Sequence, residues 1–243
     1  MSTSGVTTFE LNRDQIINAA LRKVGAVSEG QAATAQNIID ATIALNAMLK
    51  AFQEEGMPLW AIKETIFPLT ATRKYNIGLG QTINTPAPLK IIQATLLDTN
   101  TDAQNILPMN IYTHYDYNLL TTQDSAGYPI HLMYEPLLPT GVINIWPTPD
   151  PYSIQYRQIR IVYQRPFEDF VAATDTPDFP SYWSEALIYG LAWRLAPEFG
   201  VPIPDRQLIS KEATYHLDKA LSFGTEEGSF SIQPNWTYLG YGY

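Results

Sequence analysis

The chain has 243 residues, of which 45% are hydrophobic and 16% charged, a balance typical of a folded protein with a substantial core. Its net charge of −9 argues against a nucleic-acid coat, because phosphate binding needs lysine and arginine concentrated on one face. The absence of cysteine excludes disulfides, thiolate metal sites and cysteine nucleophiles. The apolar runs are too short for a membrane span, and no secretory leader is expected.

Two amphipathic helices are predicted near the start. Asn12 and Gln15 have the spacing of a capping box, so a helix should follow and continue to Gly25. A second helix is expected over residues 34–55, because its apolar residues advance in steps of three and four until a glycine and a proline end it. This stripe consists of Ile38, Ala41, Leu45, Leu49 and Phe52.

From about residue 63 the sequence changes to short β-favouring runs separated by glycine and proline. Strands are predicted at residues 65–69, 74–77, 91–97, 130–134, 142–146 and 159–163. Residues 136–141 should close a hairpin, and residues 146–151 should form an extended exit, since proline fixes φ. A short helix is expected over residues 111–122. These runs predict a small antiparallel β domain whose strand pairing is left open.

The most apolar helix is predicted within residues 177–200. Pro180 and Ser181 suit its first turn, and Gly200 marks its end. Since Glu185 and Arg194 are its only charges between residues 181 and 196, this helix should be buried among other helices. Its stripe consists of Trp183, Leu187, Leu191 and Leu195.

A fourth helix is predicted from Asp205, as its N-cap, to about Phe223. Its apolar set is Leu208, Ile209, Ala213, Leu217, Ala220 and Leu221. The remaining residues, 224–243, carry aromatic side chains among glycine, serine and asparagine, with no charge after Glu227. Such a segment usually needs a partner, and the alternative is that it folds back over its own helices.

The sequence offers little chemistry. His114, His131 and His216 share no metal-ligand spacing, and the pair of His114 with Asp116 is a common chance pattern. The paired carboxylates at 54–55, 168–169 and 226–227 suit solvated ends of elements, and no nucleophile elbow, phosphate loop or dinucleotide fingerprint occurs. We therefore predict no enzyme, no cofactor and no metal site.

Three stretches of the sequence resemble a known family. The motif FPSYWSEALIYGLAWRLAPEFG near the C-terminal end is similar to the head-to-tail adaptors of short-tailed phages (podoviruses), also called tail accessory or head-completion proteins. RDQIINAALRKVGAV and LKAFQEEGMPLW near the N-terminus support the match. The resemblance covers mainly residues 13–60 and 177–200, and it implies two helices, a β-rich insert, two more helices and an extended tail.

The predicted fold class is therefore α+β: an antiparallel bundle of about four helices, an inserted small antiparallel β domain and an extended C-terminal tail. Residues 1–62 and 178–223 would form the bundle, residues 63–177 the insert and residues 224–243 the arm. Two helices before the insert and two after it can bury their apolar faces mutually.

The resemblance implies a structural virion protein, assembled in the host cytoplasm and located in the virion neck. As a ring of twelve copies it would dock on the portal protein, extend the DNA channel for genome packaging and DNA ejection, and support tail nozzle or tail fibre proteins. DNA would pass without sequence-specific binding, and no membrane would be involved. The predicted portal-binding residues are Phe230, Ile232, Trp236, Tyr238, Tyr241 and Tyr243.

Two alternatives from different classes remain at this stage, of which one is a soluble enzyme whose active site has no recognisable motif. Tyrosine is the commonest aromatic residue, with fifteen copies, and aromatic rings on the β insert would also suit a carbohydrate- or receptor-binding tail module. Tyrosine and tryptophan are equally the residues of protein interfaces, which the resemblance favours.

Overall fold

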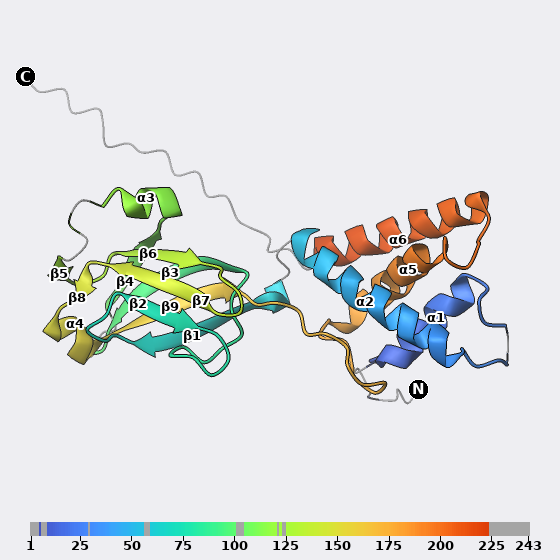
Figure 1. Ribbon diagram of the computed structural model, residues 1–243, viewed down its shortest axis with the longest axis horizontal. Coiled ribbons are helices and arrows are strands. Elements are labelled where there is room, and N and C mark those ends of the chain that lie inside the picture. Colours follow the sequence, from blue (N-terminus) through green and yellow to red (C-terminus); the bar gives the residue numbers. More distant parts are fainter. Residues whose placement is uncertain are drawn as a thin grey trace, which may run out of the picture.

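The computed structural model describes residues 5, 9–28, 30–55, 59–100, 105–120, 122 and 125–223. Figure 1 shows two parts joined by two chain segments. Each part has its own cluster of buried apolar side chains. One part, the helical part, contains α1 (Arg13–Lys23), α2 (Ala35–Glu55), α5 (Ser184–Leu195) and α6 (Ile203–Phe223), and the other is a β-sheet with two short helices.

The two N-terminal helices begin where the sequence predicts. The Asn12 side chain accepts from the N–H of Gln15 and the Gln15 side chain accepts from the N–H of Asn12, so the capping box is confirmed. The hydroxyl of Thr34 accepts from the N–H of Asn37 and caps α2 in the same way. The predicted stripe of α2 faces the core, where Ala41, Leu45, Leu49 and Phe52 are buried.

Helix α5 is the centre of the helical part, as its composition predicts. A single 3₁₀ turn (Ser181–Trp183) precedes it, and α1, α2 and α6 all pack against it. At Gly190 a Cβ atom would lie 2.8 Å from the Sδ of Met48, so α2 and α5 approach closely at this point. Gly200 has a φ of 66° and ends the segment. The whole predicted stripe is buried: Trp183, Leu187, Leu191 and Leu195.

Helix α6 differs from its prediction in two respects. It begins at Ile203, so Asp205 lies in the first turn and is not the N-cap. Ile209 and Ala220 are buried as predicted, but Leu208 is exposed. The reason is that α6 packs mainly on α5 and on the turn before it, so only a narrow side of the helix is covered.

Seven strands form one sheet in the order β1-β9-β3-β4-β6-β7-β2. All neighbouring pairs are antiparallel except β4 with β6, and β6 with β7 is the predicted hairpin. The strands are β1 (Ile62–Pro68), β2 (Lys74–Ile77), β3 (Lys90–Asp98), β4 (Asn105–Ile111), β6 (His131–Glu135), β7 (Gly141–Trp146) and β9 (Arg157–Gln164). A separate short parallel pair joins β5 (Ala126–Gly127) and β8 (Thr148–Pro149).

The connection between β1 and β2 requires the sheet to curl. These strands occupy opposite edges of the sheet, yet only residues 69–73 join them. A flat seven-stranded sheet would separate its edges by about 29 Å, whereas this connection spans at most about 22 Å. The curl brings the rings of Phe67 and Tyr75 to 5.3 Å from each other. A β-bulge between Ile91 and Gln93 helps to bend the sheet.

The second apolar core lies within this curled sheet. Strand β9 alternates as half-buried strands do, with Ile159, Ile161 and Tyr163 buried. Ile143 and Ile145 of β7 belong to the same cluster. The sheet therefore encloses its own core and does not depend on the helices for one.

Three elements in the β-sheet part differ from their prediction: α3, β4 and α4. The predicted helix at 111–122 is shorter, α3 (His114–Asn118), and strand β4 before it was missed because Pro108 interrupts its pattern. The segment predicted as an extended exit contains helix α4 (Pro151–Tyr156). Asp150 caps α4 by accepting from the N–H of Ser153, and Pro151 occupies the first turn.

The predicted fold class is wrong. The described residues form a mixed α+β protein dominated by a large curled seven-stranded sheet, a half-barrel, with six helices, and not a helical bundle with a small antiparallel β insert. The physical reason lies in two strand contacts: β9 inserts between β1 and β3, and β4 pairs with β6 and so joins these strands to β7 and β2 in one sheet. The parallel contact of β4 with β6 also departs from the prediction. The predicted C-terminal tail lies outside the described residues.

Candidate interaction surfaces

The two segments that connect the parts leave the sheet side by side. Ile62 of β1 pairs with Gln164 of β9, and Arg165 then donates its N–H to the carbonyl oxygen of Ala61 at 3.0 Å. Beyond Arg165 the chain is held along α2 by side-chain amides. The N–H of Phe167 donates to Gln53 and the N–H of Phe170 donates to Asn46, at 2.8 and 3.0 Å. The connecting segment after β9 is therefore bound to the helical part by hydrogen bonds to α2.

The place where the two connecting segments meet the helical part is called the junction. An aromatic cluster and one ion pair stabilise it. The rings of Trp60, Phe167 and Phe179 lie 4.8 Å from one another. The guanidinium of Arg165 lies 5.9 Å from the Trp60 ring and makes a two-pronged ion pair with Asp178, with Nη2 and Oδ1 2.6 Å apart. The hydrogen bond from Arg165 to Asp178 raises the pKa of the guanidinium, so Arg165 keeps its positive charge.

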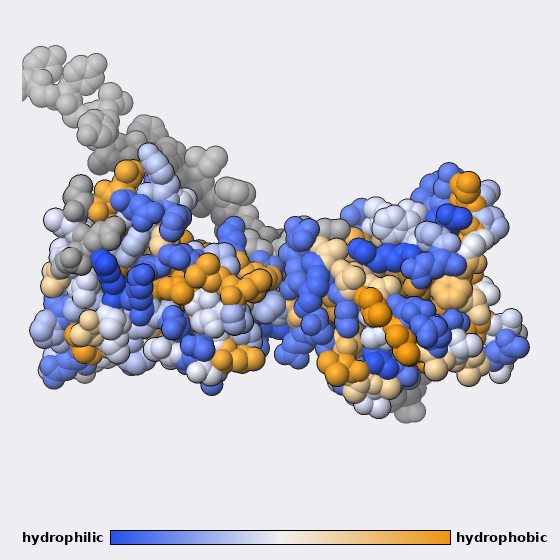
Figure 2. Space-filling view, in the orientation of Figure 1, coloured by the Kyte–Doolittle hydropathy of each residue, from blue (hydrophilic) through white to orange (hydrophobic). Residues whose placement is uncertain are grey.

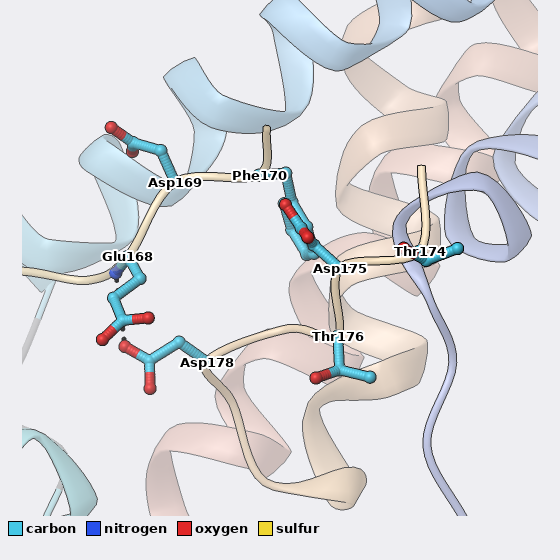
Figure 3. A pocket seen from close by; sticks show the side chains of 7 residues that line it. All are labelled: Glu168, Asp169, Phe170, Thr174, Asp175, Thr176 and Asp178. Atoms are coloured by element: carbon cyan, nitrogen blue, oxygen red, sulfur yellow. Dashed lines mark hydrogen bonds between the residues drawn. The ribbon is translucent and has the colours of Figure 1, made fainter. Parts of the chain in front are cut away.

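The loop at this junction forms an acidic pocket of about 450 Å³ (Figure 3). Asp175 accepts from the N–H groups of Val171 and Ala172, which lowers the pKa of its carboxyl group. Asp178 holds Arg165 and accepts from the N–H of Glu168, and Asp169 pairs with Lys50. These carboxylates thus stabilise the conformation of the loop through hydrogen bonds and ion pairs. No metal-binding group of three or more such side chains occurs among the described residues.

The three histidines belong to three different elements, α3, β6 and α6, as predicted. His114 is exposed on α3, and His216 stacks on Tyr189 of α5 at 5.2 Å. His131 is buried between the rings of Tyr112 and Trp146, at 4.1 and 5.5 Å, and burial lowers the pKa of its imidazole. This stack lies in the sheet near α3 and serves packing.

Exposed tyrosines gather at the end of the sheet near α4. The guanidinium of Arg157 lies 5.2 Å from the ring of Tyr128 and 5.0 Å from the ring of Tyr152. Arg157 also pairs with Asp98 at 3.2 Å. The guanidinium is thus held beside both rings by its own ion pair, which leaves less ring surface for a stacked sugar.

Large apolar side chains are also exposed on the helical part (Figure 2). Ile39 and Ile43 project from α2 on the side opposite its buried stripe. A groove of about 500 Å³ lies between α5 and the end of α6, where Tyr182 and Phe223 meet edge to face at 4.8 Å. Other exposed members are Trp193, Ile203, Leu208 and Tyr215.

The predicted portal-binding residues, Phe230, Ile232, Trp236, Tyr238, Tyr241 and Tyr243, all lie outside the described residues. The groove at Phe223 is where the described chain ends. Sequence reasoning missed the exposed pair on α2, although two isoleucines four residues apart and outside the main stripe were a readable signal. It also missed the pair of Arg165 with Asp178, for which no local pattern exists.

These features are typical of a structural protein with several contact surfaces: two cores, a fixed junction and exposed apolar helix faces. No helix among the described residues is long and apolar enough to cross a bilayer. The family model described as SU10 adaptor protein matches residues 11–221. The chain therefore belongs to the SU10 adaptor protein family, which confirms the resemblance to phage head-to-tail adaptors.

The same match supports a structural role as a phage adaptor within the virion, and a role that is generally not enzymatic. No curated protein sequence matches the chain.

Proposed function

We propose that this chain is a head-to-tail adaptor that docks on the portal, extends the DNA channel and supports the distal tail components. The match of the adaptor family over residues 11–221 is the observation that carries this proposal. Twelve copies would form the ring, assembled in the host cytoplasm. The net charge of −9 suits a channel wall, because like charge repels the DNA backbone and keeps it from binding.

The proposed division of labour follows the chain. Residues 1–62 and 178–223 would form the ring wall, residues 63–177 would face the tail nozzle or fibres, and residues 224–243 would reach the portal. Two separate buried clusters support a division between helices and sheet. The fixed junction around Arg165 supports the transmission of force from one part to the other.

The arm proposal rests on composition and multiplicity. Trp236, Tyr238, Tyr241 and Tyr243 would be the main anchors, with Phe230 and Ile232 as secondary contacts. A single arm loses much conformational entropy when it becomes ordered. Arms on one ring bind at high effective concentration, so that weak contacts add up to a stable joint.

Co-sedimentation with portal-bearing heads tests the proposal. The full chain should sediment with the heads, and a chain lacking residues 228–243 should stay in the supernatant while keeping its circular dichroism spectrum. Trp236→Ala should weaken retention, and Trp193→Ala, which truncates an exposed tryptophan on α5, is the matched control. Normal retention of the truncated chain would place docking elsewhere. A truncated chain that precipitates would instead show that the arm covers its own core.

A further inference from the structure

Helix α2 carries a second apolar row that no described residue covers. Ile39 and Ile43 are 53% and 65% exposed, and Ala35 and Ala47, one turn beyond on each side, are exposed as well. Because these residues are four apart, they form one ridge about 18 Å long, the α2 ridge. Figure 2 shows apolar surface along α2 on the viewed side.

The charges beside the α2 ridge are mostly acidic. Asp40 and Glu54 are exposed on the same side of the helix. Lys50 lies there too, but its Nζ is 2.5 Å from a carboxylate oxygen of Asp169, which offsets its charge. A partner with apolar and basic side chains would therefore suit this surface.

Helix α6 offers such a surface. Leu208 and Tyr215 are 61% and 57% exposed, and seven residues, or two turns, separate them on one side of the helix. Lys211 and Lys219 are exposed beside them, with Lys219 Nζ 5.9 Å from the Tyr215 ring. Asp218 and Glu212 lie at the two margins, and Glu212 Oε2 is 3.7 Å from Nε2 of His216. These four residues, Leu208, Lys211, Tyr215 and Lys219, are called the α6 face.

The two surfaces cannot meet within one copy. Helix α5 packs against both α2 and α6, and the buried side of each helix faces the core around α5. The exposed sides therefore point away from that core. Two unlike surfaces on different sides of one subunit produce head-to-tail contacts, which close into a ring when the rotation between copies permits.

We propose that the α2 ridge of one copy packs against the α6 face of the next copy. The proposal rests on the proposed function, in which copies form a ring, and assigns the two surfaces that join them. The ridge of alanine and isoleucine fits the groove of a neighbouring helix. Acidic residues beside the ridge meet lysines on the α6 face, which sets the direction of the contact. The contact is weak in isolation, because a net charge of −9 opposes association.

Disulfide trapping tests this contact directly, because the chain has no cysteine of its own. Ile43→Cys and Leu208→Cys chains carrying tags of different mass are mixed under a mild oxidant. A total concentration of about 1 mM populates contacts as weak as about −4 kcal/mol. We expect the mixed dimer to form in several-fold excess over both same-variant dimers. Ile39→Cys with Tyr215→Cys provides a second pair if either first variant fails to fold.

Matched controls separate the contact from random collision. Ile66→Cys, on the exposed side of β1, replaces Ile43→Cys in the control mixture. Lys211→Glu with Lys219→Glu on the Leu208→Cys chain should lower the mixed-dimer yield several-fold. Lys63→Glu with Lys90→Glu, which reverses two exposed lysines on the sheet, should leave it unchanged.

The outcomes are distinct. A mixed-dimer yield no greater than that of the Ile66→Cys control overturns the proposal, and so does a predominance of the Ile43→Cys same-variant dimer, which would indicate a symmetric contact. If the wild-type chain still sediments with portal-bearing heads in that case, the adaptor function stands and only this interface is lost. If the wild-type chain fails to sediment, the adaptor function is contradicted whatever the trapping shows.

Discussion

Substitution of Leu191 by alanine should destabilise the helical part more than any comparable change on its surface. Leu191 is 0% exposed, and Leu187 and Leu195, one turn away on either side, are also fully buried. A buried Leu→Ala change costs about 2–5 kcal/mol, and the cost rises with the volume of the cavity that remains. Since α1, α2 and α6 all pack on α5, the surroundings cannot easily collapse, and the upper half of that range is expected.

Urea unfolding followed by tryptophan fluorescence measures this effect. Trp60 and Trp183 lie in the core around α5, so their emission reports on the helical part. The midpoint should fall while the slope with denaturant stays unchanged. Leu208→Ala is the matched control, because the same atoms are removed from an exposed position, and it should change the stability by no more than about 0.5 kcal/mol.

A loss below about 1 kcal/mol for Leu191→Ala, or equal losses for both variants, would refute the reasoning. Either result would mean that α5 is not the packing centre of the helical part.

Three further outcomes are expected. Asp178→Asn should lower the free energy of unfolding, measured by thermal or urea melts, by about 2–3 kcal/mol, which is below the range for a fully buried ion pair because Asp178 is partly exposed. Asp169→Asn, which removes an exposed ion pair with Lys50, should lower it by at most about 1 kcal/mol. Burial lowers the pKa of His131 in the folded protein, so the stabilisation from its neutral imidazole is complete above the unfolded pKa of about 6.5. This stabilisation is lost as the pH falls from about 6.5 toward the lower pKa of the folded state. Thermal melts of His131→Phe between about pH 5 and 7 should lack this pH dependence. Trp236→Ala should weaken portal binding by about 2 kcal/mol per arm, measured as loss of co-sedimentation.

The four long helices, α1, α2, α5 and α6, could be predicted because their determinants are local. The capping box at Asn12 and the four-residue stripe ending at Leu195 each specify a helix from its own residues. The strands of the seven-stranded sheet other than β4 were located for the same reason, whereas the two-residue strands β5 and β8 were not predicted. The order of the strands in the sheet could not be predicted, because alternation indicates which side of a strand is buried but not which strand lies beside it. The pairing of β9 with both β1 and β3 joins residues far apart in the chain.

The candidate surfaces also differ in whether local sequence predicts them. The exposed ridge on α2 is readable in the sequence, because Ile39 and Ile43 repeat at helical spacing outside the main stripe. The ion pair of Arg165 with Asp178 depends on how a loop folds back on itself, and no spacing rule specifies it. The family was identified from packing motifs around α1, α2 and α5, which are the regions where local pattern and final structure agree.

The side-by-side exit of β1 and β9 has a mechanical consequence. A pull on the far end of the sheet, with the helices held fixed, reaches both connecting segments from the same side and is shared between two chain crossings. Strand β9 is bonded to β1 on one edge and to β3 on the other, with its hydrogen bonds perpendicular to the strand direction. Tension along β9 therefore loads its hydrogen bonds to β3 in shear, all at once, and does not peel them one by one. This arrangement favours a sheet that stays folded under axial tension.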